Sequence, residues 1–303
     1  MIATDLSGGV AIHSVLVATD FSAASVKAQR HAISIARHFQ SRFYLAHIVS
    51  SVGLNMVAAD AREDAMKITL REMTDLEYAM EQNGSLQGLS HEFILGRGDV
   101  WTELQSVIRR HQIDLIVIGT HARHGIEKMI LGSVAEKIIR EADQLVLTVG
   151  PQSGSDASLV STEGVLTFLF PTNFGASSLK ALPHAISFCN HFRAKLVLLH
   201  VAPSSRLVAA GLILEEQKIP PREIHTRLRN LIPANALSVA PEFMVALGDR
   251  GEQILHAAHS LPADLIIMGL DHAHHGRAAA HLPATTTYNV ICQARCAVLT
   301  VRN

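Results

Sequence analysis

The sequence lacks any apolar run near the roughly 20 residues that a membrane-spanning helix needs, so no membrane partner is expected. It also lacks an excess of charge of one sign, because 26 Lys and Arg residues balance 27 Asp and Glu residues. Without a strongly basic surface, we expect no nucleic-acid partner. Residues 1–9 contain neither the basic start nor the apolar stretch of a secretory signal, so a cytoplasmic protein is predicted.

Cysteine is also scarce, with three residues that all fall in the second half of the chain. Cys292 and Cys296 are predicted to lie four apart on one helix, and Cys189 stands alone. This number and spacing indicate no disulfide framework. A length of 303 residues, with 48% hydrophobic and 17% charged residues, is typical of two globular domains.

What the chain does contain is an internal repeat. Thr19-Asp20-Phe21 matches Thr172-Asn173-Phe174, and His47 matches His200 at the same offset. Further matching pairs are 114–119 with 264–269 and 145–149 with 297–301. Residues 150–158 are rich in Gly, Pro and Ser, as expected of a flexible connection. We therefore predict two domains, residues 1–150 and 160–303.

The first half alternates apolar strands with amphipathic helices. The predicted strands are 13–18, 43–49, 89–95, 114–119 and 145–149, and the predicted helices are 23–39, 56–82, 99–110 and 133–142. Continuous apolar strands between amphipathic helices indicate an α/β fold with an open parallel sheet and helices on both faces. Ligands bind such sheets beyond the carboxyl ends of the strands.

One loop has the features of a phosphate cradle. Residues 119–134 form a glycine-containing loop that runs into a helix, whose free N–H groups would face an anion. Ser133 is predicted to cap this helix, with Glu136 completing a capping box. Taken alone, Gly132 and Ser133 would be better interpreted as an ordinary helix start, because such caps are common. Because Asp20 ends the first strand at the same sheet edge, we favour a composite ligand site.

The loop resembles that of the universal stress protein family, whose nucleotide-binding members carry Gly, two residues, Gly, nine residues, Gly, and then Ser or Thr. Gly119, Ala122, Gly132 and Ser133 occupy these positions in order, with Ala122 in place of the second glycine. The added methyl group either narrows the phosphate pocket or is tolerated where the backbone is ordinary. The resemblance implies two tandem Rossmann-like, adenine nucleotide alpha hydrolase-like domains, each with an open five-stranded parallel sheet.

The resemblance also implies roles for individual residues. Thr19 and Asp20 would contact the adenosine part, with Ala18 in place of a family proline, and Ile48 would contact adenine. The phosphate and ribose side would be lined by Ile118, Gly119, Ala122, Gly132, Ser133 and Val134. From the sequence alone, Asp20 fits a cap of the next helix near Ser22 and Ile48 fits simple burial. The expected ligand is ATP or another adenine nucleotide, with or without Mg.

The second copy differs at the same loop. In residues 269–283, His272, Leu282 and Pro283 stand where the later glycines and the serine are expected, and Asn173 replaces the aspartate. Proline lacks the N–H that would face a phosphate. We therefore predict one nucleotide per chain, bound in the first domain.

A histidine-rich stretch follows in the second copy. Imidazole and carboxylate side chains can bind Zn or a similar metal, and the candidates are Asp271, His272, His274 and His275. Their spacing fits no familiar metal signature, so a solvated polar loop is preferred and Zn is not expected.

The leading hypothesis is a non-catalytic regulator or stress-protective module of the universal stress response. Family resemblance implies an intramolecular pseudo-dimer in which segments 145–149 and 297–301 pack together, and it allows a homodimer. The alternatives are a scaffold protein with a vestigial site and a slow ATPase. No oriented nucleophile, base or acidic metal pair is apparent, so we identify no catalytic residue.

Overall fold

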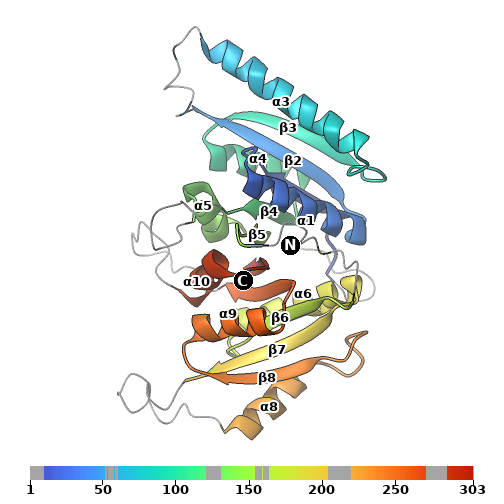
Figure 1. The fold of residues 1–303 in the computed structure, drawn as a ribbon, viewed down its shortest axis with the longest axis vertical. Coiled ribbons are helices and arrows are strands. Elements are labelled where there is room, and N and C mark those ends of the chain that lie inside the picture. The colour runs from blue at the N-terminus through green and yellow to red at the C-terminus, as the bar shows by residue number, and fades with distance from the viewer. Residues whose placement is uncertain are drawn as a thin grey trace. The chain divides into compact units, whose positions relative to one another are not determined.

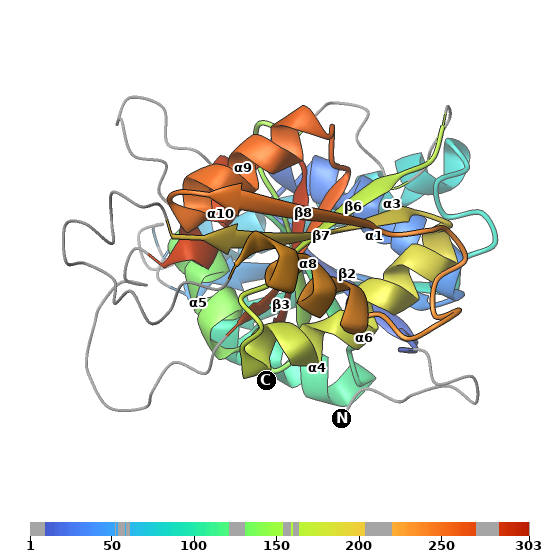
Figure 2. The ribbon, with the colours of Figure 1, turned by 90° about the horizontal axis from the view of Figure 1, so that it is seen from below.

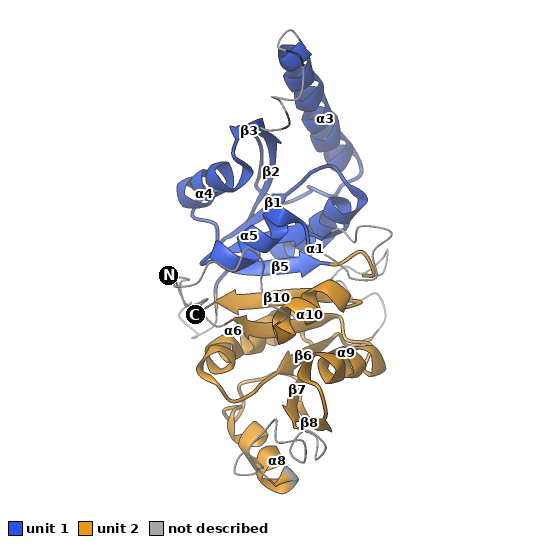
Figure 3. Cartoon of the chain, turned by 90° about the vertical axis from the view of Figure 1, so that its left-hand side faces the viewer, with its two compact units in different colours: residues 1–3, 11–121, 131–149 blue, residues 4–10, 122–130, 150–303 orange. Residues whose placement is uncertain are grey.

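The computed structural model describes residues 10–51, 53, 58, 61–120, 131–153, 159, 164–203, 220–270 and 285–302. The chain divides into two compact units, coloured separately in Figure 3. The first contains nearly all described residues before Gly150, and the second contains those from Gly150 onward.

The first unit contains five parallel strands. They are β1 (Ser14–Ala18), β2 (Arg42–Ser50), β3 (His91–Gly98), β4 (Leu115–Gly119) and β5 (Leu145–Val149). Their spatial order is β3-β2-β1-β4-β5, so the chain grows first to one side of β1 and then to the other. The reversal lies between β1 and β4, where Ala18 is paired with Ile118. This is the position at which open α/β sheets bind ligands.

Helices cover both faces of this sheet. They are α1 (Ala23–Phe39), α3 (Arg62–Gln82), α4 (Val100–His111) and α5 (Ser133–Glu141). Right-handed crossovers assign α1 and α3 to one face and α4 and α5 to the other, and Figure 3 shows α3 and α4 on opposite sides of β2 and β3. Coverage on both sides explains why four of the five residues of the central strand β1 are buried.

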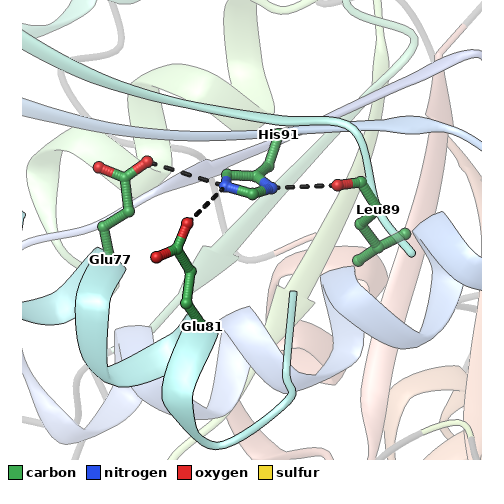
Figure 4. A network of polar contacts seen from close by, with 4 residues as sticks. All are labelled: Glu77, Glu81, Leu89 and His91. Atoms are coloured by element: carbon green, nitrogen blue, oxygen red, sulfur yellow. Dashed lines mark hydrogen bonds and ion pairs between the residues drawn. The ribbon is translucent and has the colours of Figure 1, made fainter. Parts of the chain in front are cut away.

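Helix α3 covers the edge strand β3 with a mixed contact. Met73 and Met80 are its buried side chains. On the same helix, Glu77 approaches His91 Nε2 at 3.8 Å, and Glu81 approaches the same nitrogen at 3.7 Å (Figure 4). The other ring nitrogen, Nδ1, donates to the Leu89 carbonyl at 3.0 Å. The two carboxylates therefore form ion pairs only with a protonated ring.

The second unit repeats the same topology. Its strands are β6 (Thr167–Pro171), β7 (Lys195–Ala202), β8 (Glu242–Leu247), β9 (Leu265–Leu270) and β10 (Ala297–Arg302), in the order β8-β7-β6-β9-β10. Its helices are α6 (Ala176–Phe192), α8 (Pro221–Asn230), α9 (Arg250–Ser260) and α10 (Thr286–Gln293). Helices α9 and α10 lie on one side of the unit's strands and α6 and α8 on the other (Figures 1 and 2).

The predicted α/β fold with parallel strands is confirmed, with corrections at element ends. Gly132, in an extended conformation, is the N-cap of α5, and Ser133 is its first residue, so the predicted Ser133 capping box is wrong. Cys296 follows α10 instead of lying on it, because the chain is already extended at Ala294. In the described part of the chain, no helix has both the length and the apolar character to cross a membrane.

Candidate functional site

A cavity of about 270 Å³ lies at the carboxyl ends of β1 and β4. Every residue predicted for the nucleotide site lines it except Ala122, which lies outside the described residues. The lining residues are Ala18, Thr19, Asp20, Ser25, Ala46, His47, Ile48, Val100, Leu104, Ile118, Gly119, Gly132, Ser133, Val134, Ala135 and Ile138. The structure thus brings together residues from five separate stretches of sequence.

Thr19 holds the turn that follows β1. Its hydroxyl donates to Ser25 Oγ at 3.0 Å and accepts from the Phe21 N–H at 3.1 Å. Its own N–H donates to the Ala46 carbonyl at 2.9 Å. The side chain is buried and these contacts use its hydroxyl within the protein. Thr19 therefore shapes the wall of the cavity.

Phe21 adopts a left-handed backbone conformation, with a φ of 59°. Such a conformation costs a non-glycine residue about 1 kcal/mol or more. The ring of Phe21 lies against His47, with 4.5 Å between ring centroids. His47 Nδ1 in turn donates to the Thr19 carbonyl at 2.8 Å, since a carbonyl can only accept. In the neutral ring, His47 Nε2 is then a hydrogen-bond acceptor beside the cavity.

Asp20 is exposed at the mouth of the cavity. Its Oδ1 accepts from the Ser22 N–H at 3.1 Å, which closes the turn before α1. The cap of α1 is Ser22, whose hydroxyl accepts from the Ser25 N–H at 3.2 Å. The alternative role of Asp20 as the helix cap is therefore wrong, although it helps to position the cap.

The two described glycines of the loop motif differ in whether the fold itself requires a glycine at that position. A Cβ on Gly119 would lie 2.5 Å from the Ala24 carbonyl oxygen and 2.7 Å from the Ser25 nitrogen. Glycine is thus required there by the close packing of α1 on β4. At Gly132, by contrast, a Cβ would meet no atom of the described residues within 4 Å, and φ is −62°. Neither the packing of the described residues nor the backbone conformation demands glycine at position 132.

The start of α5 supplies hydrogen-bond donors to the cavity. Ser133, Val134 and Ala135 form its first turn and all line the cavity. N–H groups of a first turn have no partner within the helix and carry the positive end of its dipole. No Lys or Arg side chain lines the described cavity. An anion bound here would therefore be held mainly by backbone donors.

The opposite wall is apolar and includes residues that the sequence analysis missed. Val100 and Leu104 come from the first turns of α4, one helical turn apart, and face the same cavity as Ala46. The signal for them was available, because α4 also begins at the carboxyl edge of the sheet. The repetition of His47 as His200 at the same offset could likewise have indicated that His47 belongs to the site.

The metal candidates Asp271, His272, His274 and His275 lie outside the described residues. Among the residues that the structure does describe, no group of three or more His, Cys, Asp and Glu side chains is arranged to hold a metal ion.

The second unit has a cavity of about 230 Å³ at the equivalent place. Helix α10 begins there at Thr286 with Thr285 as its N-cap, so Thr286 occupies the helix position of Ser133. The predicted alignment of Leu282 and Pro283 with Gly132 and Ser133 is therefore wrong, because the second unit's loop before the helix is longer. His272, Leu282 and Pro283 themselves lie outside the described residues.

Comparisons with known proteins agree with this architecture. The chain is 29% identical over 136 residues to universal stress protein MJ0531 of Methanocaldococcus jannaschii, covering 45% of this chain and 80% of that protein. It is 31% identical over 99 residues to a universal stress protein of Mycolicibacterium smegmatis, covering 32% and 73%. A universal stress protein structure from Archaeoglobus fulgidus shares the fold, with a TM-score of 0.69 and 17% identity over 95% of this chain and 98% of that one.

The model of the universal stress protein family matches residues 11–150 and again residues 166–302. The two matches cover most of the chain and correspond to the two repeated units. The resemblance predicted from the loop spacing is thereby confirmed, and the chain belongs to the universal stress protein family.

Proposed function

We propose that this protein acts in the universal stress response by binding ATP or a related adenine nucleotide in its first domain, residues 1–150. In this proposal it works in the cytoplasm as a non-catalytic regulator or stress-protective module. The nucleotide would bind with or without Mg on its phosphates. No residue is assigned a catalytic role.

Gly132 carries the proposal. Its φ of −62° suits any residue, and a Cβ at this position, within the cavity lining, would meet no atom of the described residues. Alanine would be easily accommodated by the protein itself. A glycine with no structural requirement, at the N-terminus of a helix beside a cavity, is what close approach of a ligand phosphate to the backbone calls for.

The two walls of the cavity suit the two parts of a nucleotide. The apolar side chains of Ile48, Val100 and Leu104 offer contact to a flat base. Across the cavity, the first turn of α5 offers N–H donors and the Ser133 hydroxyl to phosphates. Asp20, at the mouth, offers a carboxylate acceptor to ribose hydroxyls.

A second candidate function follows from the absence of a cation in the described lining. Within that described lining, phosphate charge is balanced by partial charges of the backbone. This favours, as the second candidate function, an interaction or scaffold protein whose nucleotide site is vestigial.

The family resemblance also predicts that segments 145–149 and 297–301 pack together, and it allows a homodimer. Both remain predictions.

Isothermal titration of ATP into the full chain tests the proposal. We expect one nucleotide per chain, and Gly132→Ala is expected to weaken binding without lowering the unfolding temperature of the ligand-free protein. Gly53→Ala is the matched control, because Gly53 does not line the cavity and, among the described residues, its Cβ would meet Ser50 alone, at 3.9 Å. Absence of ATP binding at high micromolar concentration, in folded protein, would refute the proposal and favour the scaffold.

A further inference from the structure

The cavity of the second unit lies at the carboxyl ends of β6 and β9. Its lining consists of Pro171, Thr172, Asn173, Ser177, Ser178, Val201, Arg250, Ile254, Met268, Gly269, Thr285, Thr286 and Thr287. Side chains with hydroxyl, amide or guanidinium groups make up most of this wall. In the first unit's cavity, by comparison, apolar residues predominate.

The backbone that frames this cavity repeats that of the first unit. Thr172 Oγ1 is 2.9 Å from Ser178 Oγ, and Phe174 has a left-handed φ of 60°. His200 Nδ1 donates to the Thr172 carbonyl at 2.8 Å. A Cβ on Gly269 would lie 2.8 Å from the Ser178 nitrogen, so the glycine again permits the helix to pack on the strand. The scaffold of the site is therefore intact.

The charge of the lining has been reversed within this scaffold. Asn173 stands in the place of Asp20, and its Oδ1 accepts from the Gly175 N–H at 2.9 Å in the same kind of turn. Arg250 stands in the place of Val100. Among the described lining residues, one substitution removes the single carboxylate, and the other adds a guanidinium.

The backbone fixes the position of Arg250 beside the cavity. Gly248 has a φ of 141°, and Asp249 then caps α9 by accepting from the Glu252 N–H at 3.0 Å. The first unit uses the same construction, with Gly98 at a φ of 153° and Asp99 capping α4. The first residue of each helix, Arg250 in one unit and Val100 in the other, lines its cavity.

Threonine hydroxyls from the start of α10 also line the cavity, together with Arg250. Thr285 Oγ1 accepts from the Tyr288 N–H at 3.2 Å, which leaves its own O–H available to donate. Thr286 and Thr287 follow in the first turn of α10, which adds N–H groups with no partner inside the helix. Among the described residues, no carboxylate lies within ion-pair distance of the Arg250 guanidinium.

We propose that the second unit binds a compact oxyanion of the phosphate class, either inorganic phosphate or the phosphate of a small metabolite. Arg250 supplies the charge-assisted hydrogen bonds, and Thr285, Thr286 and Thr287 supply hydroxyl donors beside the N-terminus of α10. This combination of guanidinium, hydroxyls and helix N–H groups matches the geometry of a tetrahedral oxyanion. The site is separate from the adenine-nucleotide site proposed for the first unit.

Titration of inorganic phosphate into the full chain at low ionic strength tests this proposal. We expect binding that Arg250→Gln weakens by at least about tenfold, the effect of losing a charge-assisted hydrogen bond. Thr286→Val is expected to weaken binding in the same direction. Arg222→Gln is the matched control, because Arg222 is an exposed arginine of α8 that does not line the cavity. Circular dichroism and thermal melting check that each variant folds.

Failure of phosphate to bind, or equal losses for Arg250→Gln and Arg222→Gln, would overturn the proposal. Loss of phosphate binding in Gly132→Ala would also overturn it, because it would locate the anion in the first unit. If ATP binding fails while Arg250-dependent phosphate binding persists, only the nucleotide proposal falls. Glycerol 3-phosphate, titrated in parallel, distinguishes the two sources of the oxyanion by which one binds more tightly.

Discussion

The buried imidazole of His31 gives a quantitative prediction for the first unit. The ring is 1% exposed on α1, and among the described residues neither of its nitrogens has a hydrogen-bond partner. Burial lowers the pKa of His31 from 6.5 to about 4. Above pH 6.5 the ring is neutral in both the folded and the unfolded chain, so the stability associated with it is fully present.

As the pH falls below 6.5, the unfolded chain takes up a proton that the folded unit does not bind, and the free energy of unfolding decreases. The loss continues until the folded pKa near 4 is reached. At 1.36 kcal/mol per pKa unit, the whole loss is about 3 kcal/mol. Both His31→Leu and His31→Gln remove the titrating group, so both are expected to remove this part of the pH dependence.

Urea unfolding between pH 7.5 and 4.5 measures this effect. The single tryptophan, Trp101, is buried on α4, so its fluorescence reports on the first unit. The two variants are expected to differ from each other at pH 7.5, because leucine leaves no unsatisfied polar group and glutamine leaves a buried amide. Their stability must nevertheless fall less steeply with acid than that of the wild type. Parallel stability curves for all three proteins would contradict the assigned burial penalty.

Three further outcomes test the packing. Gly119→Ala is expected to destabilise the first unit by about 1 to 3 kcal/mol, because its methyl group overlaps the α1 backbone; an unchanged urea midpoint would contradict this. Met80→Ala is expected to cost about 2 to 5 kcal/mol by leaving a cavity under α3, whereas Glu81→Gln costs less than about 1 kcal/mol because its ion pair is half-exposed. In native protein at pH 7.5, iodoacetamide is expected to modify the partly exposed Cys292 before Cys296, whose thiol pKa is raised to about 12 by burial. Peptide mass spectrometry measures the order of modification, and faster modification of Cys296 would contradict this expectation.

The elements that local pattern determines were predictable from the sequence. The helix 23–39 and the strand 145–149 have the predicted bounds, because a run of apolar residues between polar ends leaves little choice of period. The cap of α5 was not predictable from residue type. Ser133 is a residue type that often caps helices, yet the N-cap of α5 is the extended Gly132, one residue earlier, and Ser133 is the first helical residue.

The cavity of the second unit was missed for a different reason. Counting forward from Gly269 without a gap assigns Pro283 to the position of Ser133, whereas counting back from the strand at Ala297 assigns Thr285, the N-cap of α10. A loop of altered length breaks the repeat on one side only. The position of Arg250 beside the cavity could not be predicted from its neighbours in sequence, because the cavity forms only where the starts of α9 and α10 meet at the sheet edge.

The crowding around Gly119 and Gly269 affects how related sequences are to be interpreted. In each unit, this glycine allows a helix backbone to lie against a strand, whatever the neighbouring cavity contains. A related protein could therefore retain this glycine during evolution even if it does not bind a nucleotide. The more informative position is Gly132, where the described part of the chain leaves room for a Cβ and the proposed phosphate does not.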